Sequence, residues 1–218
     1  MKPFSEANER NKAPILDVLQ KHLRVSTRVL EIGSGTGQHA VHFSAGLPHL
    51  VWQPTDQLQH LDGIMQWVDE AGLSNLRKPL PLWVQVDDAV SGLVSTNVST
   101  FRKLLEESES GTGFDAAFTA NTLHIMGWPE VEALFAALPT MLRSGPSALI
   151  VYGPFNRDGE FTSESNRHFD AWLKARDPRS GIRDAEAVGA LAYAQGFELI
   201  DDLAMPANNR MLVWRRAP

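Results

Sequence analysis

The stretch VLEIGSGTGQ, residues 29–38, constrains the fold of this chain most, because three alternating glycines directly follow a short apolar run. The run VLEI has the composition of a strand, and Gly33, Gly35 and Gly37 form a G-x-G-x-G pattern behind it. Glycine tolerates positive φ angles and lets a ligand approach backbone amides closely. The pattern therefore predicts a strand, a tight turn that contacts a ligand, and a helix over about 38–45.

Strand and helix patterns alternate along most of the remaining chain. Runs with strand character lie at 29–32, 49–56, 80–88, 115–119, 147–155, 196–203 and 210–216. Runs with helical spacing lie at about 14–23, 38–45, 57–71, 98–107, from 129 onward, 164–175 and 184–195. This alternation predicts a mainly parallel sheet with helices on both faces. No helix fits between residues 202 and 210, so the last two strands are expected to pair antiparallel.

The chain has no internal repeat and no compositional boundary, so a single domain over 1–218 is expected. Residues 1–27 are expected to form an N-terminal helical segment, in which Pro14 occupies the first turn. The polar region 155–184 follows the fifth strand on the ligand side of the sheet. Together with the N-terminal segment NERNK, residues 8–12, and with Asn208 and Asn209, it is expected to form a lid or acceptor pocket. The alternative is a set of surface helices with solvated charges.

Composition excludes several classes of function. The chain contains no cysteine, which rules out a disulfide framework, a thiolate nucleophile and cysteine-ligated metal. Its net charge of −6 argues against nucleic acid as a partner, and no run is long enough to cross a membrane. His39 and His42 have no visible third ligand, so no metal is expected. A cytoplasmic protein is predicted, and its oligomeric state is left open.

The spacing of the glycines also discriminates between ligands. A dinucleotide fingerprint requires a small residue where this chain has Gln38, and a Walker loop requires a G-K-S or G-K-T triplet that is absent from the sequence. A carboxylate at Glu31 disfavours a pyrophosphate and suits a cationic ligand. A nicotinamide-dependent oxidoreductase is therefore the weaker alternative.

The sequence VLEIGSGTG resembles the first motif of the class I S-adenosylmethionine-dependent methyltransferases. Five further segments, ERNKAPIL, SGTGQHA, ANTLHIM, FTSESN and MPANN, resemble a small methyltransferase-like family that includes methyltransferase-like protein 26. This resemblance covers nearly the whole chain. It implies a three-layer, Rossmann-like α/β fold of seven strands whose last strand is antiparallel beside the fifth, with S-adenosyl-L-methionine as cofactor.

The resemblance also implies a set of cofactor-binding residues near the ends of the first four strands. Asp56 corresponds to the acidic residue that binds the ribose hydroxyls, and Asn121 to the residue that lines the methionine moiety. Asp87 corresponds to the residue that meets the adenine amine, with its neighbour Asp88 as the alternative. The complete predicted set is Glu31, Gly33, Ser34, Gly35, Gly37, Asp56, Gln57, Asp87 and Asn121. From the residue type alone, Asp56 could equally be a helix cap or turn former.

His124 is the candidate catalytic residue, because it follows the fourth strand and an unperturbed histidine titrates near neutrality. The alternative is a histidine that bonds the loop backbone or touches only the cofactor. Asn121 is not followed by the two prolines and aromatic residue of nucleic-acid N-methyltransferases. The resulting interpretation is in-line methyl transfer to a small-molecule acceptor, with a non-catalytic S-adenosylmethionine- or S-adenosylhomocysteine-binding protein as the alternative.

Overall fold

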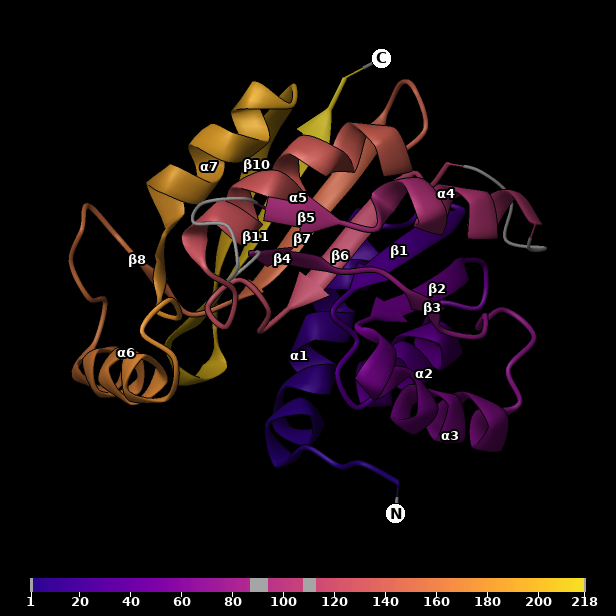
Figure 1. The fold of residues 1–218 in the computed structure, drawn as a ribbon, viewed down its shortest axis with the longest axis horizontal. Helices are drawn as coiled ribbons and strands as arrows, with labels where there is room; N and C mark the ends of the chain where they lie inside the picture. Colours follow the sequence, from indigo (N-terminus) through magenta and orange to yellow (C-terminus); the bar gives the residue numbers. More distant parts are fainter. Residues whose placement is uncertain (1, 87–93, 108–112, 218) are drawn as a thin grey trace.

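The computed structural model of the chain describes residues 2–86, 94–107 and 113–217. A seven-stranded sheet forms its centre, with the order β10-β11-β7-β6-β1-β2-β3 (Figure 1). Its strands are β1 (Arg28–Ile32), β2 (Val51–Asp56), β3 (Leu80–Pro81), β6 (Ala116–Ala120), β7 (Ser147–Gly153), β10 (Phe197–Met205) and β11 (Asn209–Arg216). β11 lies between β7 and β10 and is antiparallel to both, whereas the other pairings are parallel. The predicted fold class is confirmed.

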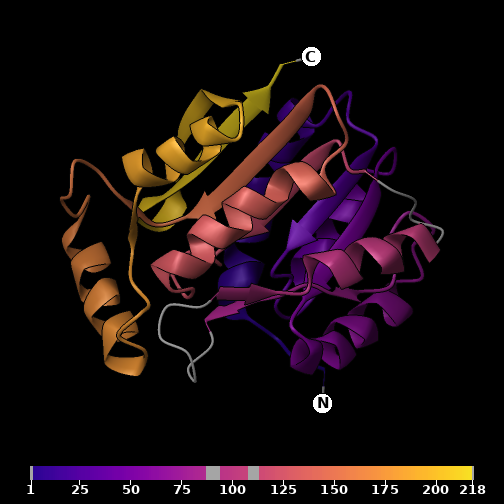
Figure 2. The same cartoon turned by 45° about the horizontal axis from the view of Figure 1, so that its top comes forward.

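Helices cover both faces of this sheet (Figures 1 and 2). One face carries α1 (Glu6–His22), α2 (Gln38–Gly46) and α3 (Leu61–Ala71), and the other carries α4 (Val98–Glu107), α5 (Trp128–Met141) and α7 (Ala185–Ala194). The helix α6 (Glu164–Arg176) stands apart from both layers at the end of the molecule where β8 lies. Two short 3₁₀ helices, η1 (Leu58–His60) and η2 (Pro206–Asn208), complete the set.

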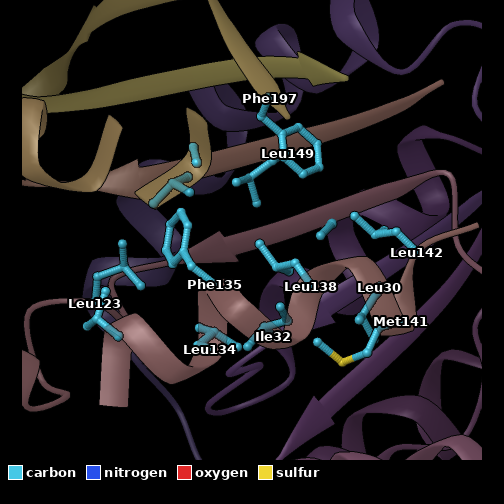
Figure 3. Close-up of a cluster of buried hydrophobic side chains, with 14 of the residues drawn as sticks. Leu30, Ile32, Leu123, Leu134, Phe135, Leu138, Met141, Leu142, Leu149 and Phe197 are labelled. Atoms are coloured by element: carbon cyan, nitrogen blue, oxygen red, sulfur yellow. The ribbon is translucent and has the colours of Figure 1, made fainter. Parts of the chain in front are cut away.

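Two hydrophobic clusters lie on opposite faces of the sheet, as alternation along buried strands requires. In β1, Val29 packs with the α1–α3 side and Leu30 with the α4, α5 and α7 side. Figure 3 shows the second cluster, in which Phe135 and Leu138 of α5 face Leu149 of β7. The sheet is thus buried on both faces, and its carboxyl edge is left free for a ligand.

The prediction for the first helix was wrong at its start. α1 begins at Glu6, and Pro14 lies inside the helix rather than in its first turn. The Oγ of Ser5 accepts a hydrogen bond from the amide of Asn8 and caps the helix, which explains the earlier start. The helix therefore starts about two turns earlier than the sequence suggested.

The predicted third strand over 80–88 was also wrong in extent. Among its described residues, 80–86, only Leu80–Pro81 joins the seven-stranded sheet. β4 (Val84–Val86) pairs antiparallel with β5 (Val94–Thr96) in a separate ribbon, and residues 87 and 88 lie outside the described part of the chain. The side chain of Asn97 diverts the chain, because its Oδ1 accepts from the Trp83 amide at 2.8 Å and its Nδ2 donates to the Pro81 carbonyl at 2.9 Å.

Two further features differ from the sequence prediction. The predicted helix over 57–71 is divided into η1 and α3. A two-stranded parallel ribbon of β8 (Phe155–Asn156) and β9 (Arg183–Asp184) was not predicted. It pairs the two ends of the polar region 155–184 with each other.

Candidate functional site

A cavity of about 680 Å³ opens at the carboxyl ends of β1, β2 and β6. Its lining includes the glycine turn, the residues that end β2 and the loop that follows β6. Among the predicted cofactor-binding residues, those that line it are Gly33, Ser34, Gly35, Asp56, Gln57 and Asn121. Asp87, the predicted adenine-binding residue, falls outside the described residues. The structure thus brings together predicted residues that are up to 88 positions apart in the chain, from Gly33 to Asn121.

The three glycines of the turn adopt positive φ angles, and each is needed for a different reason. Gly33 (φ 72°) has no room for a side chain, because a β-carbon there would lie 2.7 Å from the Oγ1 of Thr122. At Gly35 (φ 59°) no described atom lies within 4 Å of that position, so its backbone faces the cavity. Gly37 (φ 89°) instead lets α2 approach α3, where a β-carbon would meet the Ile64 backbone at 3.1 Å. Gly33 and Gly35 shape the site, and Gly37 supports it.

Asp56 is the carboxylate that lies beside the glycine turn in the cavity, and several groups hold its side chain. Its Oδ2 accepts from the amide of Gly35 at 2.7 Å. Its Oδ1 accepts from the amide of Gln57 and pairs with Nδ1 of His60, each at 2.7 Å. A carboxylate offers about four acceptor positions, so one remains for a ligand. The side chain is therefore preoriented on the edge of the cavity.

Glu31 lies behind the glycine turn and not in the cavity lining. Its Oε2 accepts from Ser34 Oγ and from Trp52 Nε1, each at 2.9 Å. Burial raises the pKa of Glu31 to about 7, although both hydrogen bonds lower it. The amide of Ser34 in turn donates to the Thr55 carbonyl at 2.9 Å. Glu31 thus contacts the turn itself and holds it against β2.

Gln38 takes part in a network that joins the glycine turn to α1. Its Oε1 accepts from the Ser5 amide at 2.6 Å and from Thr36 Oγ1 at 3.0 Å. Asn8 also reaches Thr36 Oγ1, at 3.2 Å, and both Ser5 and Asn8 line the cavity. The bulky residue that breaks the dinucleotide pattern therefore ties the N-terminal helix over the site. Sequence reasoning missed Ser5, whose partner Gln38 lies 33 residues away, whereas Asn8 belongs to the segment 8–12 that the sequence placed at the acceptor pocket.

Of the two histidines of α2, His39 contacts the N-terminal helix α1. His39 is buried, its Nε2 lies 2.7 Å from Asn11 Oδ1, and burial lowers its pKa to about 4. Within residues 2–86, 94–107 and 113–217, no three His, Cys, Asp or Glu side chains gather closely enough to hold a metal ion. In the same ranges, no helix is both long and apolar enough to span a bilayer.

Asn121 and His124 both lie in the loop after β6, but of the two only Asn121 lines the cavity. Asn121 has φ 57°, donates its amide to the Tyr152 carbonyl at 2.9 Å and lines the cavity. The His124 ring is buried beside Phe169 of α6, with ring centroids 5.3 Å apart. Burial, helped by the charge of Arg183, lowers the pKa of His124 to about 4. At neutral pH its imidazole is therefore uncharged.

The region 155–184 contributes to the cavity through its last part. Asp177 and Arg179 line the cavity together with Glu130, which lies in the first turn of α5. Arg179 pairs with Asp177 through Nη2 at 3.1 Å, and its Nη1 lies 3.8 Å from Glu130. His60 and Arg179 were not singled out from the sequence. Only the folded chain shows that these side chains share one cavity.

The sheet order, the antiparallel β11 and the cavity at the carboxyl edge define a Rossmann-like methyltransferase fold. An O-methyltransferase family protein from Burkholderia thailandensis has a similar structure, with a TM-score of 0.72 and 14% identity over 97% of this chain and 58% of that one. An O-methyltransferase family 2 protein from Planctomyces limnophilus, solved in complex with apigenin, gives 0.70 and 13% over 95% and 57%. PigF, solved with SAH, gives 0.68 and 12% over 94% and 55%.

The chain spans just over half the length of these similar structures. The chain belongs to the family described as "Protein of unknown function (DUF938)", whose model matches residues 2–216. The likeness to the solved structures therefore concerns the fold.

Proposed function

We propose that this protein is an S-adenosylmethionine-dependent methyltransferase with a small-molecule acceptor. The observation that carries the proposal is the direct bond between the Gly35 amide and Asp56 on the wall of one cavity. It joins a glycine turn open to a ligand with a preoriented carboxylate at the end of the next strand. A volume of about 680 Å³ is in the range for sites that bind cofactors and small molecules.

The residues present fit this cofactor. Gly33 and Gly35 offer backbone without side chains, Asp56 offers an acceptor position for a ribose hydroxyl, and Asn121 lies at the end of β6. Glu31 acts through Ser34 by holding the turn. S-Adenosylmethionine supplies a methyl group already activated by a sulfonium. The protein then needs to align acceptor and donor, and to remove a proton where the acceptor carries one.

We assign the acceptor side to the region 155–184, of which Asp177 and Arg179 line the cavity. The similar structure solved with apigenin supports a small molecule in that role. The net charge of −6 argues against nucleic acid. We also infer a cytoplasmic protein and, from the quoted sequence segments, a place beside the family that includes methyltransferase-like protein 26.

His124 is the proposed group that assists the acceptor. It is neutral at pH 7, since its pKa is about 4, and it can therefore accept a proton. The same low pKa makes it a weak base, which places its contribution toward the lower end of the roughly 10²–10⁴-fold range for such groups. Its burial beside Phe169 also supports the alternative, a wall residue that holds the loop after β6.

Isothermal titration calorimetry with S-adenosylhomocysteine and with NADH tests the proposal. We expect S-adenosylhomocysteine to bind and NADH not to bind. Gln38 supports this expectation, because its side chain is buried in the α1 network where a dinucleotide fingerprint requires a small residue. Binding of NADH alone would reject the proposal. Transfer of labelled methyl groups to metabolite extracts separates an enzyme from a non-catalytic binding protein.

A further inference from the structure

Four consecutive carbonyls in the loop after β6 accept hydrogen bonds from one distant segment. The loop carbonyls and their donors are Leu123 with Arg183 Nε (3.1 Å), His124 with the Gly181 amide (2.9 Å), Ile125 with Ser180 Oγ (3.1 Å) and Met126 with Arg183 Nη2. Carbonyls in an irregular loop have no helix or sheet partners, so they must bond elsewhere or to water. Here a single segment, Ser180–Arg183, serves all four.

Arg183 holds both ends of this loop. Its guanidinium donates to the first and the last of the four carbonyls, and also to the Arg179 carbonyl at 2.8 Å. A guanidinium carries five donors in a rigid plane, whereas an ammonium is a single point. Lysine at position 183 could therefore not reproduce this set of bonds. Burial lowers the pKa of Arg183, and Asp170 and Glu130 oppose that shift.

The segment that holds the loop is itself anchored to α6. The buried carboxylate of Asp170 accepts from the Ile182 amide at 2.8 Å and pairs with Lys174 at 2.7 Å. A side chain at Gly181 would come within 3.0 Å of Asp170 Oδ1. The loop, the segment 180–183 and α6 are thus linked through buried polar contacts. These contacts hold the last part of the 155–184 region in place beside the loop after β6.

The loop lines the cavity, and so does the chain that directly precedes the segment Ser180–Arg183. Ile125 and Met126 line it from the loop, and Asp177 and Arg179 line it from the chain just before Ser180. We propose that Arg183 is a positioning residue that sets the loop Leu123–Met126 in the place that ligand binding requires. This inference rests on the proposed function, because it takes the cavity to be the cofactor site.

The test compares Arg183→Met and Arg183→Lys with Arg176→Met as a matched control. Arg176 is exposed at the end of α6, with its guanidinium 4.5 Å from the Trp172 ring centre and away from the four carbonyls. Calorimetry with S-adenosylhomocysteine gives the affinity of each variant at a temperature where circular dichroism shows it folded. We expect about tenfold weaker binding for Arg183→Met, a loss of at least about threefold for Arg183→Lys, and no change for the control.

Chemical rescue separates positioning from a general loss of stability. Added methylguanidinium is expected to restore most of the S-adenosylhomocysteine affinity of Arg183→Ala and to leave Arg176→Ala unchanged. Should the Arg183 variants fail to fold, Ser180→Ala removes one donor, to Ile125, and is expected to weaken binding about threefold.

Three results would overturn the inference. They are equal affinities for Arg183→Met and Arg176→Met, no rescue by methylguanidinium, and, in the second design, unchanged affinity for Ser180→Ala. If the unsubstituted protein does not bind S-adenosylhomocysteine at all, the proposed function fails and this inference fails with it.

Discussion

Replacing Glu31 with glutamine is expected to remove a large part of the pH dependence of folding stability. Glu31 is 2% exposed, and both of its hydrogen-bond donors, Ser34 and Trp52, reach the same oxygen. Burial raises the pKa of this carboxyl from an ordinary 4.5 to about 7. The folded protein therefore holds this proton in a range where the unfolded chain has released it. Glutamine keeps an acceptor oxygen in the same place but cannot titrate.

The magnitude follows from the two pKa values. At 1.36 kcal/mol per pKa unit, a difference between 4.5 and about 7 corresponds to about 3 kcal/mol. Because the folded-state pKa is the higher one, this stability is present below pH 4.5 and is lost as pH rises through about 7. Buried histidines with lowered pKa act in the opposite direction, and their contribution cancels when the two proteins are compared at each pH.

Urea unfolding at several pH values between about 5 and 8 measures this difference, since most of the change falls in that range. We expect the stability of Glu31→Gln relative to the unsubstituted protein to rise by about 2–3 kcal/mol across it. Glu132→Gln, an exposed site on α5, serves as control and should show no such trend. A stability difference between Glu31→Gln and the unsubstituted protein that stays constant with pH would refute the reasoning.

Three further predictions concern the cavity. Asp56→Ala should weaken S-adenosylhomocysteine binding by about 1–3 kcal/mol in calorimetry. Asp62→Ala, at an exposed position of α3, should not weaken it; equal affinities of the two variants would remove Asp56 from the site. His124→Gln should lower methyl transfer by roughly 10²-fold with cofactor affinity retained, and a loss confined to affinity would show that His124 only holds the loop after β6. Gly33→Ala should lower the melting temperature more than Gly35→Ala, because only the former places a β-carbon 2.7 Å from a threonine hydroxyl; the reverse order would contradict the assigned roles.

Local pattern was enough to predict the centre of the fold. The apolar runs became β1, β2, β6, β7, β10 and β11. Residues 202–210 are too few for a crossover helix, which correctly predicted the antiparallel β11; they hold only the short 3₁₀ helix η2. The G-x-G-x-G pattern correctly indicated a turn with positive φ angles. Asp56 ends β2, which pairs with β1, so it lies beside the glycine turn that follows β1. These features follow from short-range rules, since strand pairing brings carboxyl ends to one edge.

The walls of the cavity depended on tertiary structure. The sequence could not show that Asn97 diverts the third strand, because the bonds that do so join residues 14 and 16 positions apart. It could not show that Ser5 meets Gln38, or that Arg183 holds the loop 57 to 60 residues earlier. Spacing in a sequence reports neighbours along one helix or strand. Hydrogen bonds between loops depend on how the packed layers bring distant segments together, so only the folded chain determined which polar side chains surround the cavity.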